Sequence, residues 1–395
     1  MKVLLSWLRE FAPFPDDPEL IGDTLSDLGT PVEGMQRLGP GWEGIVVARV
    51  LDLRPHLHAD RIQLVDVDPG DGEALQVCCG AFNMAVGDLV PLATLGTTMP
   101  DGLAIERRKL RGQWSNGMLC SSSELGLSDE HGGIRILPAG LGVGAALADA
   151  LDAPADALYE IEVNPNRPDA MSVAGLARDL AAKLDLPFTL SRPEVITEGE
   201  RAEDEVTVEV LDPDLCGRFG VWVLRNVTVG TAPDWMQHRL TALGMRPVNA
   251  LVDISNYVML ELGQPNHPYD LALVAGRGLR VRRAHEGESL VTLDDVRRVV
   301  TTDDLLICDG EDNPVGIAGV MGGATSEISA ATTDVLLEMA WFLPMAVSRT
   351  TRRLGLRSEA SARFEKGCDP EVIPLAAARF CQLAADICGA VAAPG

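Results

Sequence analysis

The sequence lacks several features that would assign the protein to a broad class. No apolar run approaches the ~18–20 residues that a membrane-spanning helix needs. Residues 1–14 carry charges inside their apolar stretch and offer no small-residue cleavage site, so no signal peptide is predicted. We therefore expect a soluble, cytoplasmic protein that has no membrane partner.

The eight cysteines include no C-x-x-C pair, which argues against zinc knuckles, thioredoxin-type redox sites and a disulfide framework. The sequence has no G-x-x-x-x-G-K-[ST], no G-x-S-x-G and no H-E-x-x-H, so the phosphate-binding loop, the nucleophile elbow and the zinc protease helix are absent. His56 and His58 form a possible metal pair, but two isolated loop histidines are more typical of a solvated loop. No metal site is predicted.

Positive charge is scarce, with 33 basic against 58 acidic residues and a formal net charge of -25. Such a chain repels phosphate backbones at long range, so any nucleic-acid role depends on local basic patches, and no DNA partner is expected. Arg107, Arg108 and Lys109 form the densest positive cluster of the first half. Basic residues also block strand addition at a solvated sheet edge, and spacing alone does not decide between the two interpretations.

With 395 residues, two or three domains are expected. Short apolar runs separated by turn clusters predict five or six strands at regular spacing, which fits a five-stranded Greek-key barrel. The runs are 45–53, 62–68, 74–79, 89–95 and 103–110. A helix capped by Ser172 is predicted up to residue 186, followed by a polar linker over 191–205.

From Val206 onward, strands and helices mix without a strict βαβ order, which indicates an α+β unit. Helices are predicted over 232–243, with Thr231 as the cap, and over 251–262, ending at Gly263. Further strands are predicted at 206–210, 219–223, 279–284, 289–293, 297–301 and 305–308, and a helix at 375–387.

The sharpest signal is the run 335–342, which is apolar everywhere except at Glu338. On a strand Glu338 shares its face with Leu336 and Ala340, where an ionised carboxylate is costly unless it is paired or serves a ligand. The alternative is a wet face. Two weaker signals accompany it: the glycine turn at 318–323, and a stiff loop that holds His267 between two prolines.

Together these segments resemble the β subunit of bacterial phenylalanine–tRNA ligase over essentially the whole chain. The matching pieces are KVLLSWLREF, SNGMLCSSSELGL, EIEVNPNRPDAMSVAGLARDLAAKL, RPVNALVDISNYVMLELGQPNHPYDL, GVMGG and RTTRRLGLRSEASARFEKGCDP. So many long motifs in the right order make the match highly specific.

The resemblance implies a multidomain α+β fold. A small α/β N-terminal domain (1–40 and 151–200) is interrupted by a tRNA-binding oligonucleotide-binding barrel (41–150). An α+β editing domain (206–380) follows, and 381–395 begins the connection to later domains, which would lie beyond residue 395. The alternatives are a shortened natural relative or a truncated chain.

The family's site residues map onto matching positions of this sequence. The resemblance implies that Ser255, Asn256, His267 and Glu338 are catalytic and that Pro265, Ala318, Gly319 and Glu338 form the substrate pocket. Apart from this mapping, the local sequence pattern suggests as tRNA contacts Arg107, Arg108, Lys109, Ser115, Asn116, Gly117, Arg349, Arg352 and Arg353, with Arg357, Arg363 and Lys366 in the same basic run. The alternative for that run is an exposed, salt-bridged helix. Two departures are visible: serine at 255 replaces the usual threonine, and the loop has HPYD where HAFD is typical.

The implied activity is hydrolysis of tyrosine wrongly attached to tRNA(Phe), within a subunit that supports aminoacylation. A hydrophobic pocket rejects an added hydroxyl only about 10²-fold, whereas a site that hydrogen-bonds it discriminates ~10⁴–10⁵-fold. Direct attack by water is expected, with N–H groups around Ala318–Gly319 holding the oxyanion and His267 acting as base or orienting group.

The family pairs this subunit with a catalytic α subunit in an α2β2 assembly. ATP and magnesium are expected for the complete enzyme, and no cofactor is expected in this chain. The alternatives are a non-catalytic RNA-binding or assembly subunit with a vestigial pocket, and a shortened relative that edits in trans.

Overall fold

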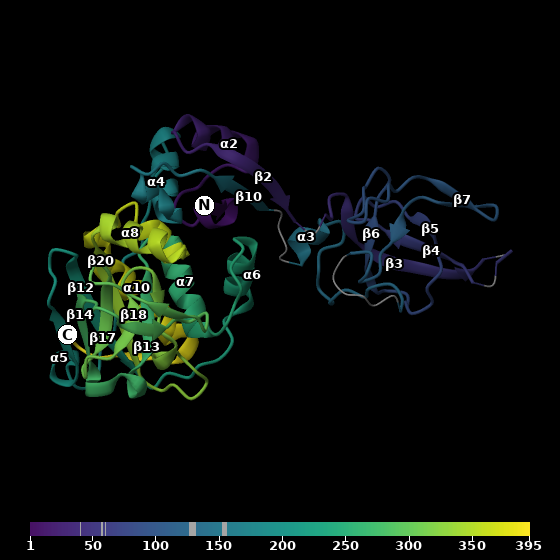
Figure 1. The fold of residues 1–395 in the computed structure, drawn as a ribbon. Helices are drawn as coiled ribbons and strands as arrows, with labels where there is room; N and C mark the ends of the chain where they lie inside the picture. The colour runs from purple at the N-terminus through teal and green to yellow at the C-terminus, as the bar shows by residue number, and fades with distance from the viewer. Residues whose placement is uncertain (40, 57, 60, 126–131, 152–155) are drawn as a thin grey trace. The chain divides into compact units, whose positions relative to one another are not determined.

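The computed structural model describes residues 1–39, 41–56, 58–59, 61–125, 132–151 and 156–395. These residues form two units, and Figure 1 shows their elements. The main unit contains residues 1–35 and 158–395, and the barrel unit contains residues 36–157. The finer division of the main unit into an N-terminal and an editing domain stays a prediction.

The main unit begins with a three-stranded sheet built from distant parts of the sequence. Its strand order is β1-β10-β2, and β1 runs antiparallel to β10. The strands are β1 Lys2–Leu4, β2 Val32–Leu38 and β10 Asp156–Ile161. Three helices accompany them: α1 Leu5–Leu8, α2 Pro18–Asp27 and α4 Val173–Lys183. The Ser172 side chain accepts a hydrogen bond from the Gly175 amide, which confirms the predicted cap of α4.

The barrel unit contains a five-stranded antiparallel sheet in the order β5-β4-β3-β6-β9. Its strands are β3 Ile45–Pro55, β4 Gln63–Asp68, β5 Leu75–Cys79, β6 Leu89–Ala93 and β9 Met118–Leu119. The outer strands β5 and β9 contact each other, so the sheet is a nearly closed barrel, as predicted. Apolar side chains of alternate residues, such as Val65, Val67 and Val77, fill its interior.

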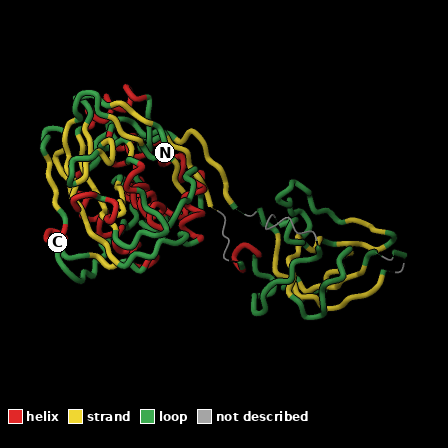
Figure 2. Tube along the Cα trace, turned by 60° about the horizontal axis from the view of Figure 1, so that its bottom comes forward, coloured by secondary structure: helices red, strands yellow, loops and turns green. Residues whose placement is uncertain are grey.

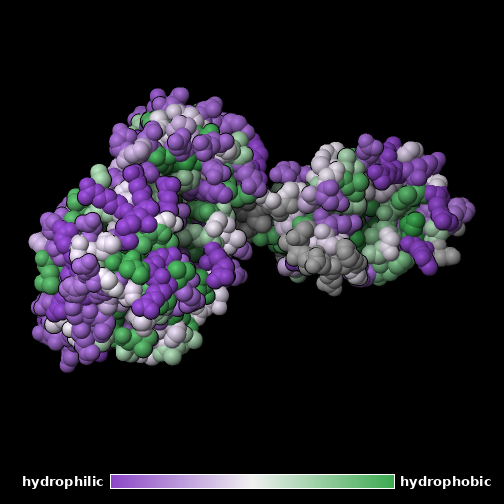
Figure 3. Space-filling view, in the orientation of Figure 1, coloured by the Kyte–Doolittle hydropathy of each residue, from purple (hydrophilic) through white to green (hydrophobic). Residues whose placement is uncertain are grey.

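The predicted strand at 103–110 is only partly correct. Its last residues form β7 Arg108–Leu110, which pairs with β8 Gln113–Ser115 in a separate hairpin. A short helix, α3 Leu147–Ala150, lies near the end of the barrel unit's sequence. Hydrophilic residues gather over the end of the unit that carries β7, as Figure 3 shows.

Beyond residue 200 the main unit contains two larger sheets and a hairpin (Figure 2). One sheet has the order β13-β20-β12-β21, with β13 Asn266–Asp270, β20 Val335–Phe342, β12 Cys216–Arg225 and β21 Val391–Ala392. The other has the order β11-β14-β17-β18-β19, with β11 Thr207–Val210, β14 Gly278–Arg283, β17 Leu305–Asp309, β18 Pro314–Ile317 and β19 Met321–Gly322. The hairpin pairs β15 Ser289–Val291 with β16 Arg297–Val299.

Both sheets contribute to one apolar core, in which Val223, Leu336 and Ala340 of the first sheet join Leu279 and Ile307 of the second. The helices are α5 Ala202–Glu205, α6 Asp234–Ala242, α7 Ala250–Leu262, α8 Pro344–Leu354, α9 Glu359–Phe364 and α10 Ile373–Cys388. Helices α7 and α10 pack against each other, α7 also contacts β13, and α10 also contacts β12 and β20. The mixed order of strands and helices agrees with the predicted α+β class.

Helix caps follow the sequence in two places and differ in one. Gly263 ends α7 in the left-handed conformation (φ 78°), as predicted. Thr231 does not cap α6, because that helix begins at Asp234 with Pro233 as its N-cap.

Among the described residues, none of the helices has the length and apolar character needed to cross a bilayer.

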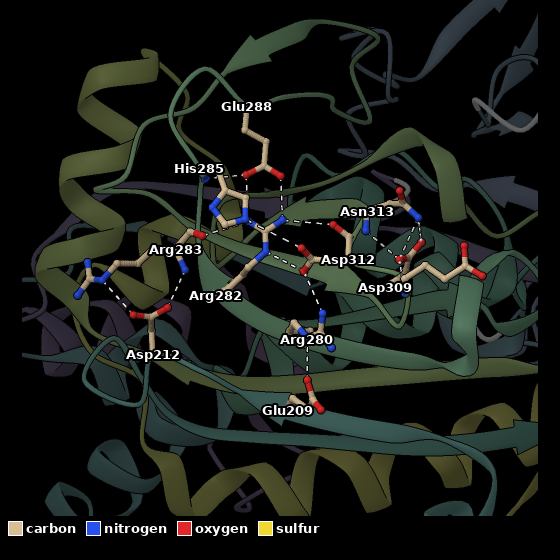
Figure 4. A network of polar contacts seen from close by, with 11 residues as sticks. Glu209, Asp212, Arg280, Arg282, Arg283, His285, Glu288, Asp309, Asp312 and Asn313 are labelled. Atoms are coloured by element: carbon tan, nitrogen blue, oxygen red, sulfur yellow. Dashed lines mark hydrogen bonds and ion pairs between the residues drawn. The ribbon is translucent and has the colours of Figure 1, made fainter.

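A network of ion pairs surrounds Arg282 of β14, in the five-stranded sheet of the main unit (Figure 4). Arg282 is only 5% exposed, yet its guanidinium donates two hydrogen bonds to the Glu288 carboxylate (2.8 and 2.9 Å) and one to Asp312 (2.8 Å). Arg280 joins Asp312 to Glu209. The buried guanidinium of Arg282 therefore has opposite charges beside it, which is the ordinary way to keep a charge inside a fold.

Candidate functional site

Glu338 lies in the middle of β20, on the same face as Leu336 and Ala340, and is only 6% exposed. The predicted burial of Glu338 is confirmed, and the alternative of a wet face is excluded. Strand β13 pairs with β20 so that His267 lies directly opposite Glu338. Tyr269, two residues along β13, lies on the same face as His267 and donates a hydrogen bond from its hydroxyl to Glu338 Oε2 (2.9 Å).

The His267 ring packs edge-on against the ring of Tyr269, with 4.4 Å between the centroids. Its Nε2 atom is buried and has no hydrogen-bond partner among the described residues. A buried polar atom without a partner is uncommon, and each instance calls for an explanation such as a ligand or a catalytic role. The Gln264 side chain fixes the loop before β13, because its Nε2 donates to the Ala340 carbonyl (3.0 Å).

A small cavity opens beside these three side chains. Its volume is about 70 Å³, below the ~300 Å³ at which ordinary ligand pockets begin. An aromatic substrate side chain therefore fits only if the lining moves. The lining combines the polar trio with apolar residues and a glycine turn: Pro265, Asn266, His267, Tyr269, Ile307, Gly316, Ile317, Gly319, Val320, Met321, Gly322, Glu338, Phe342, Ala360 and Phe364.

Two glycines keep this cavity open. Gly319 has φ of +70°, and a Cβ there would come within 3.0 Å of Phe342 and Val347. At Gly322 a Cβ would lie 2.5 Å from His267 Cε1 and 2.9 Å from its Nε2, so any side chain would displace the imidazole. Ala318 differs from both, because it is absent from the lining and its N–H donates to the Leu305 carbonyl (3.0 Å).

Burial dominates the electrostatics of the trio. It raises the pKa of Glu338 to about 7, against the opposing effect of the hydrogen bond from Tyr269. It lowers the pKa of His267 to about 4, and burial beside Glu338 raises the pKa of Tyr269. At neutral pH the imidazole and the phenol are therefore uncharged, and Glu338 titrates close to physiological pH.

The structure brings together Pro265, His267, Gly319 and Glu338, but not the two predicted residues of α7. Ser255 is buried and donates its hydroxyl to the Asn266 carbonyl (3.1 Å), which ties α7 to β13. Asn256 lines a different pocket, together with Met1, Lys2, Glu160 and Glu359. The catalytic roles of these two residues stay predictions.

Several lining residues had no separate signal in the sequence. Tyr269 was visible only as a departure within the HPYD loop. Asn266 lines the cavity with a buried Oδ1 that has no partner among the described residues. Ala360 and Phe364 come from α9, a segment that supports the resemblance and whose only candidate site residues were basic. The sequence pattern around α9 does not indicate that this helix lines the cavity beside Glu338.

Some basic residues of α8 and α9 are exposed, whereas others are paired with acceptors of the same chain. Arg349 and Arg352 are exposed on α8. Arg353 pairs with Asp304, which is buried. Arg363 is 1% exposed and donates to the carbonyls of Met171 and Glu359 and to the Glu359 carboxylate. The expectation that Arg363 guides RNA is wrong, since its guanidinium lies inside the fold.

In the barrel unit, Arg107, Arg108 and Lys109 are exposed at hairpin β7–β8. The guanidinium of Arg107 lies 4.5 Å from the ring centroid of Trp114, and the Lys109 ammonium lies 5.5 Å from it. Trp114 itself is 42% exposed. Cations beside an exposed aromatic ring are typical of surfaces that bind single-stranded nucleic acid.

The neighbouring predicted RNA contacts hold the barrel together. The Ser115 hydroxyl accepts from the Cys78 amide and donates to the Gly117 carbonyl. The Asn116 side chain donates to the Gln76 carbonyl (3.2 Å). Gly126 and Leu127, at the end of the SNGMLCSSSELGL segment, lie outside the described residues.

The barrel unit also contains a wider hollow of about 970 Å³ near Cys79 and Glu124. Its acid is already satisfied, because Glu124 accepts hydrogen bonds from the Ser121 amide and hydroxyl, both at 2.7 Å. No group of three His, Cys, Asp or Glu side chains suited to a metal ion occurs in the described part of the chain. The cavity beside Glu338 is therefore the stronger candidate site.

Comparison with known proteins agrees with the division of the chain into a barrel unit and a main unit. Residues 45–146 match the family model "Putative tRNA binding domain", and residues 215–389 match the B3/4 domain. The chain is 47% identical over its full length to the phenylalanine–tRNA ligase β subunit of Nitratidesulfovibrio vulgaris and 46% identical to that of Anaeromyxobacter dehalogenans. It spans about half (49%) of the length of each relative. By its sequence, the chain belongs to the phenylalanine–tRNA ligase β subunit family.

Proposed function

We propose that the main unit hydrolyses tyrosine from wrongly charged tRNA(Phe) and that the cavity beside Glu338 is the editing site. The observation that carries this proposal is the pairing of a buried carboxylate with a buried, unpartnered imidazole nitrogen on one face of a sheet. The carboxylates of Glu288 and Asp312 have a cationic partner, the Arg282 guanidinium. Glu338 has none among the described residues and is free to accept a substrate hydroxyl.

Discrimination follows from the chemistry of the hydroxyl. Tyrosine donates a charge-assisted hydrogen bond to ionised Glu338, whereas phenylalanine leaves the buried carboxylate without that bond. A hydrogen bond to a charged group is worth roughly 1.5–3 kcal/mol, which corresponds to about 10- to 150-fold in rate. Phe342 and Phe364, which lie 5.1 Å apart in an edge-on pair, supply the apolar wall for the aromatic ring.

The hydrolysis itself uses water. A pKa of about 4 makes His267 a weak base at neutral pH, so its role is to orient the water or the terminal ribose by a hydrogen bond at Nε2. Of the two expected oxyanion donors, the Ala318 amide is already bonded and Gly319 lines the cavity, so we assign the oxyanion contact to the Gly319 amide. No nucleophilic serine or cysteine is assigned, so the reaction has no covalent intermediate on this chain.

For the whole protein we propose a subunit that supports aminoacylation of tRNA(Phe) in the cytoplasm. The finer arrangement is an oligonucleotide-binding barrel inserted into an α/β N-terminal domain and followed by an editing domain. The barrel contacts tRNA through hairpin β7–β8. A catalytic α subunit in an α2β2 assembly supplies the ATP- and magnesium-dependent charging step, which this chain does not perform alone.

The test is deacylation of tyrosyl-tRNA(Phe) by the intact ligase assembly that carries Glu338→Ala. We expect the rate to fall about 100-fold while hydrolysis of phenylalanyl-tRNA(Phe) stays low. The control is Glu327→Ala, which removes an exposed glutamate of the same unit. If Glu338→Ala deacylates tyrosyl-tRNA(Phe) as fast as the parent, the editing proposal is wrong.

One observation favours a second function, an RNA-binding or assembly subunit with a vestigial pocket. The cavity of about 70 Å³ does not admit a phenol ring without movement of its lining. In that case the parent binds tRNA(Phe) but leaves tyrosyl-tRNA(Phe) intact in the same assay.

A further inference from the structure

The carboxylate at the centre of the candidate site already holds a phenol from its own chain. Tyr269 is 1% exposed, and its hydroxyl donates to Glu338 Oε2 at 2.9 Å. In the described part of the chain this is the one hydrogen bond that Glu338 makes through its side chain. The Oε1 atom is left for a further donor, and Glu338 lines the cavity.

Tyr269 cannot leave this position easily. Its ring belongs to the apolar core shared by the two sheets, together with Leu336 and Ile307, and it stacks edge-on against His267. Moving the ring aside would leave a cavity in that core, which is unfavourable for so large a buried side chain. A substrate hydroxyl therefore shares the carboxylate with Tyr269 rather than replacing it.

We propose that Tyr269 is a positioning residue that sets specificity: its hydroxyl occupies Oε2 and fixes the Glu338 rotamer, so that Oε1 alone recognises the hydroxyl of the aminoacyl ester. This inference rests on the proposed editing function and names the part of the site that recognises the substrate. A carboxylate held at one oxygen presents the other in a single direction, which restricts where on the aromatic ring a hydroxyl is accepted.

The hydrogen bond from Tyr269 also favours the ionised form of Glu338, which is the form that accepts the substrate hydroxyl. A phenol that donates to a carboxylate stabilises the ionised form, whereas burial favours the protonated form. The other titratable groups around this pair are His267 on β13, the Cys216 thiol of β12 and the Cys308 thiol of β17. Burial lowers the pKa of His267 to about 4 and raises the pKa values of both thiols to about 12. All three are neutral at pH 7, so Tyr269 is the group that offsets burial.

The test is the pH profile of tyrosyl-tRNA(Phe) hydrolysis by the intact assembly that carries Tyr269→Phe. We expect the midpoint of the rise in rate to move up by about one pH unit, because Glu338 loses the bond that favours its ionised form. At pH 7 the rate falls several-fold, and it recovers at pH 8.5 after subtraction of the uncatalysed rate. A merely structural defect would lower the rate equally at both pH values.

The matched control is Tyr159→Phe, which removes a buried tyrosine hydroxyl that donates to the Pro18 carbonyl (3.0 Å). It should leave the midpoint unchanged. If the parent hydrolyses the ester and Tyr269→Phe keeps the parent's midpoint, the role of Tyr269 is wrong while the proposed function stands. If the parent hydrolyses no tyrosyl ester, the proposed function fails and recognition by Oε1 fails with it.

Discussion

The network around Arg282 and the cavity beside Glu338 treat buried charge in opposite ways. Arg282 is surrounded by carboxylate and carbonyl acceptors, and its partners Glu288 and Asp312 have lowered pKa values because of it. Glu338 has a neutral phenol as its partner, and burial raises its pKa to about 7. The first arrangement stabilises the fold, whereas the second is costly in the folded state and is therefore expected where a ligand binds.

The largest expected effect comes from breaking the satisfied network. Arg282→Met leaves Glu288 and Asp312 without their main cation, and removal of one partner from a buried ion network costs about 3–5 kcal/mol. Urea unfolding at pH 7 measures this loss. The control Arg201→Met removes the exposed pair with Glu203 and should leave stability unchanged. Equal unfolding curves for the two variants would contradict the comparison.

Removing the charge of Glu338 should stabilise the fold, whereas removing Arg282 destabilises it. The folded-state pKa of Glu338 lies above its ordinary value of 4.5, at about 7, so its ionisation destabilises the fold as pH rises through 7. A shift of this size is worth roughly 3 kcal/mol at about 1.4 kcal/mol per pKa unit. Glu338→Gln should therefore be more stable than the parent at pH 8 and about equal to it at pH 4. A gain that is the same at both pH values would argue against a raised pKa.

A substitution that crowds the imidazole sharpens the contrast between activity and stability. The Cβ of Gly322→Ala would lie 2.5 Å from His267 Cε1, and misplacement of a positioning group by about 1 Å costs on the order of 10²-fold in rate. We expect tyrosyl-tRNA(Phe) hydrolysis to fall by about that factor. Gly230→Ala is the control, since a Cβ there meets no atom within 4 Å. Normal hydrolysis by Gly322→Ala would exclude His267 from the reaction.

The smallest effect is expected in the barrel unit, whose exposed cations lie beside an aromatic ring. Trp114→Ala should weaken tRNA(Phe) binding about tenfold, since stacking of one base is worth ~1–3 kcal/mol. Filter binding at fixed salt measures the affinity. Phe82→Ala removes another exposed aromatic residue of this unit and should bind as the parent does. Equal losses in both variants would argue against a specific role for Trp114.

Local pattern predicted those features that depend on neighbours in sequence. The apolar run with one acid predicted strand β20 and the buried face of Glu338, and Ser172 and Gly263 marked the ends of their helices. The pairing of His267 with Glu338 was not visible in any pattern, because alternation within a strand does not identify the strand beside it. The resemblance suggested that these residues belong to one site without giving this register.

Contacts between elements that are distant in sequence explain where the structure differs from the predictions. Arg363 looked like part of an exposed basic run, but α9 packs inward and Met171 lies close enough to accept its hydrogen bond. Asn256 follows Ser255 in sequence, yet one helical position turns it about 100° away, into another pocket. The bond between Tyr269 and Glu338 depends on both the register and the depth of the core.

The sheet order β1-β10-β2 has a consequence for folding during synthesis. Strand β1 is synthesised well before its partner β10, which follows only after the entire barrel has been made. At ~5–20 residues per second, the interval of about 155 residues lasts roughly 8–30 s. During that time Val3 and Leu4, which are buried in the finished fold, lack their partner strand. A nascent chain held at this stage is thus an expected client of chaperones that shield exposed apolar segments.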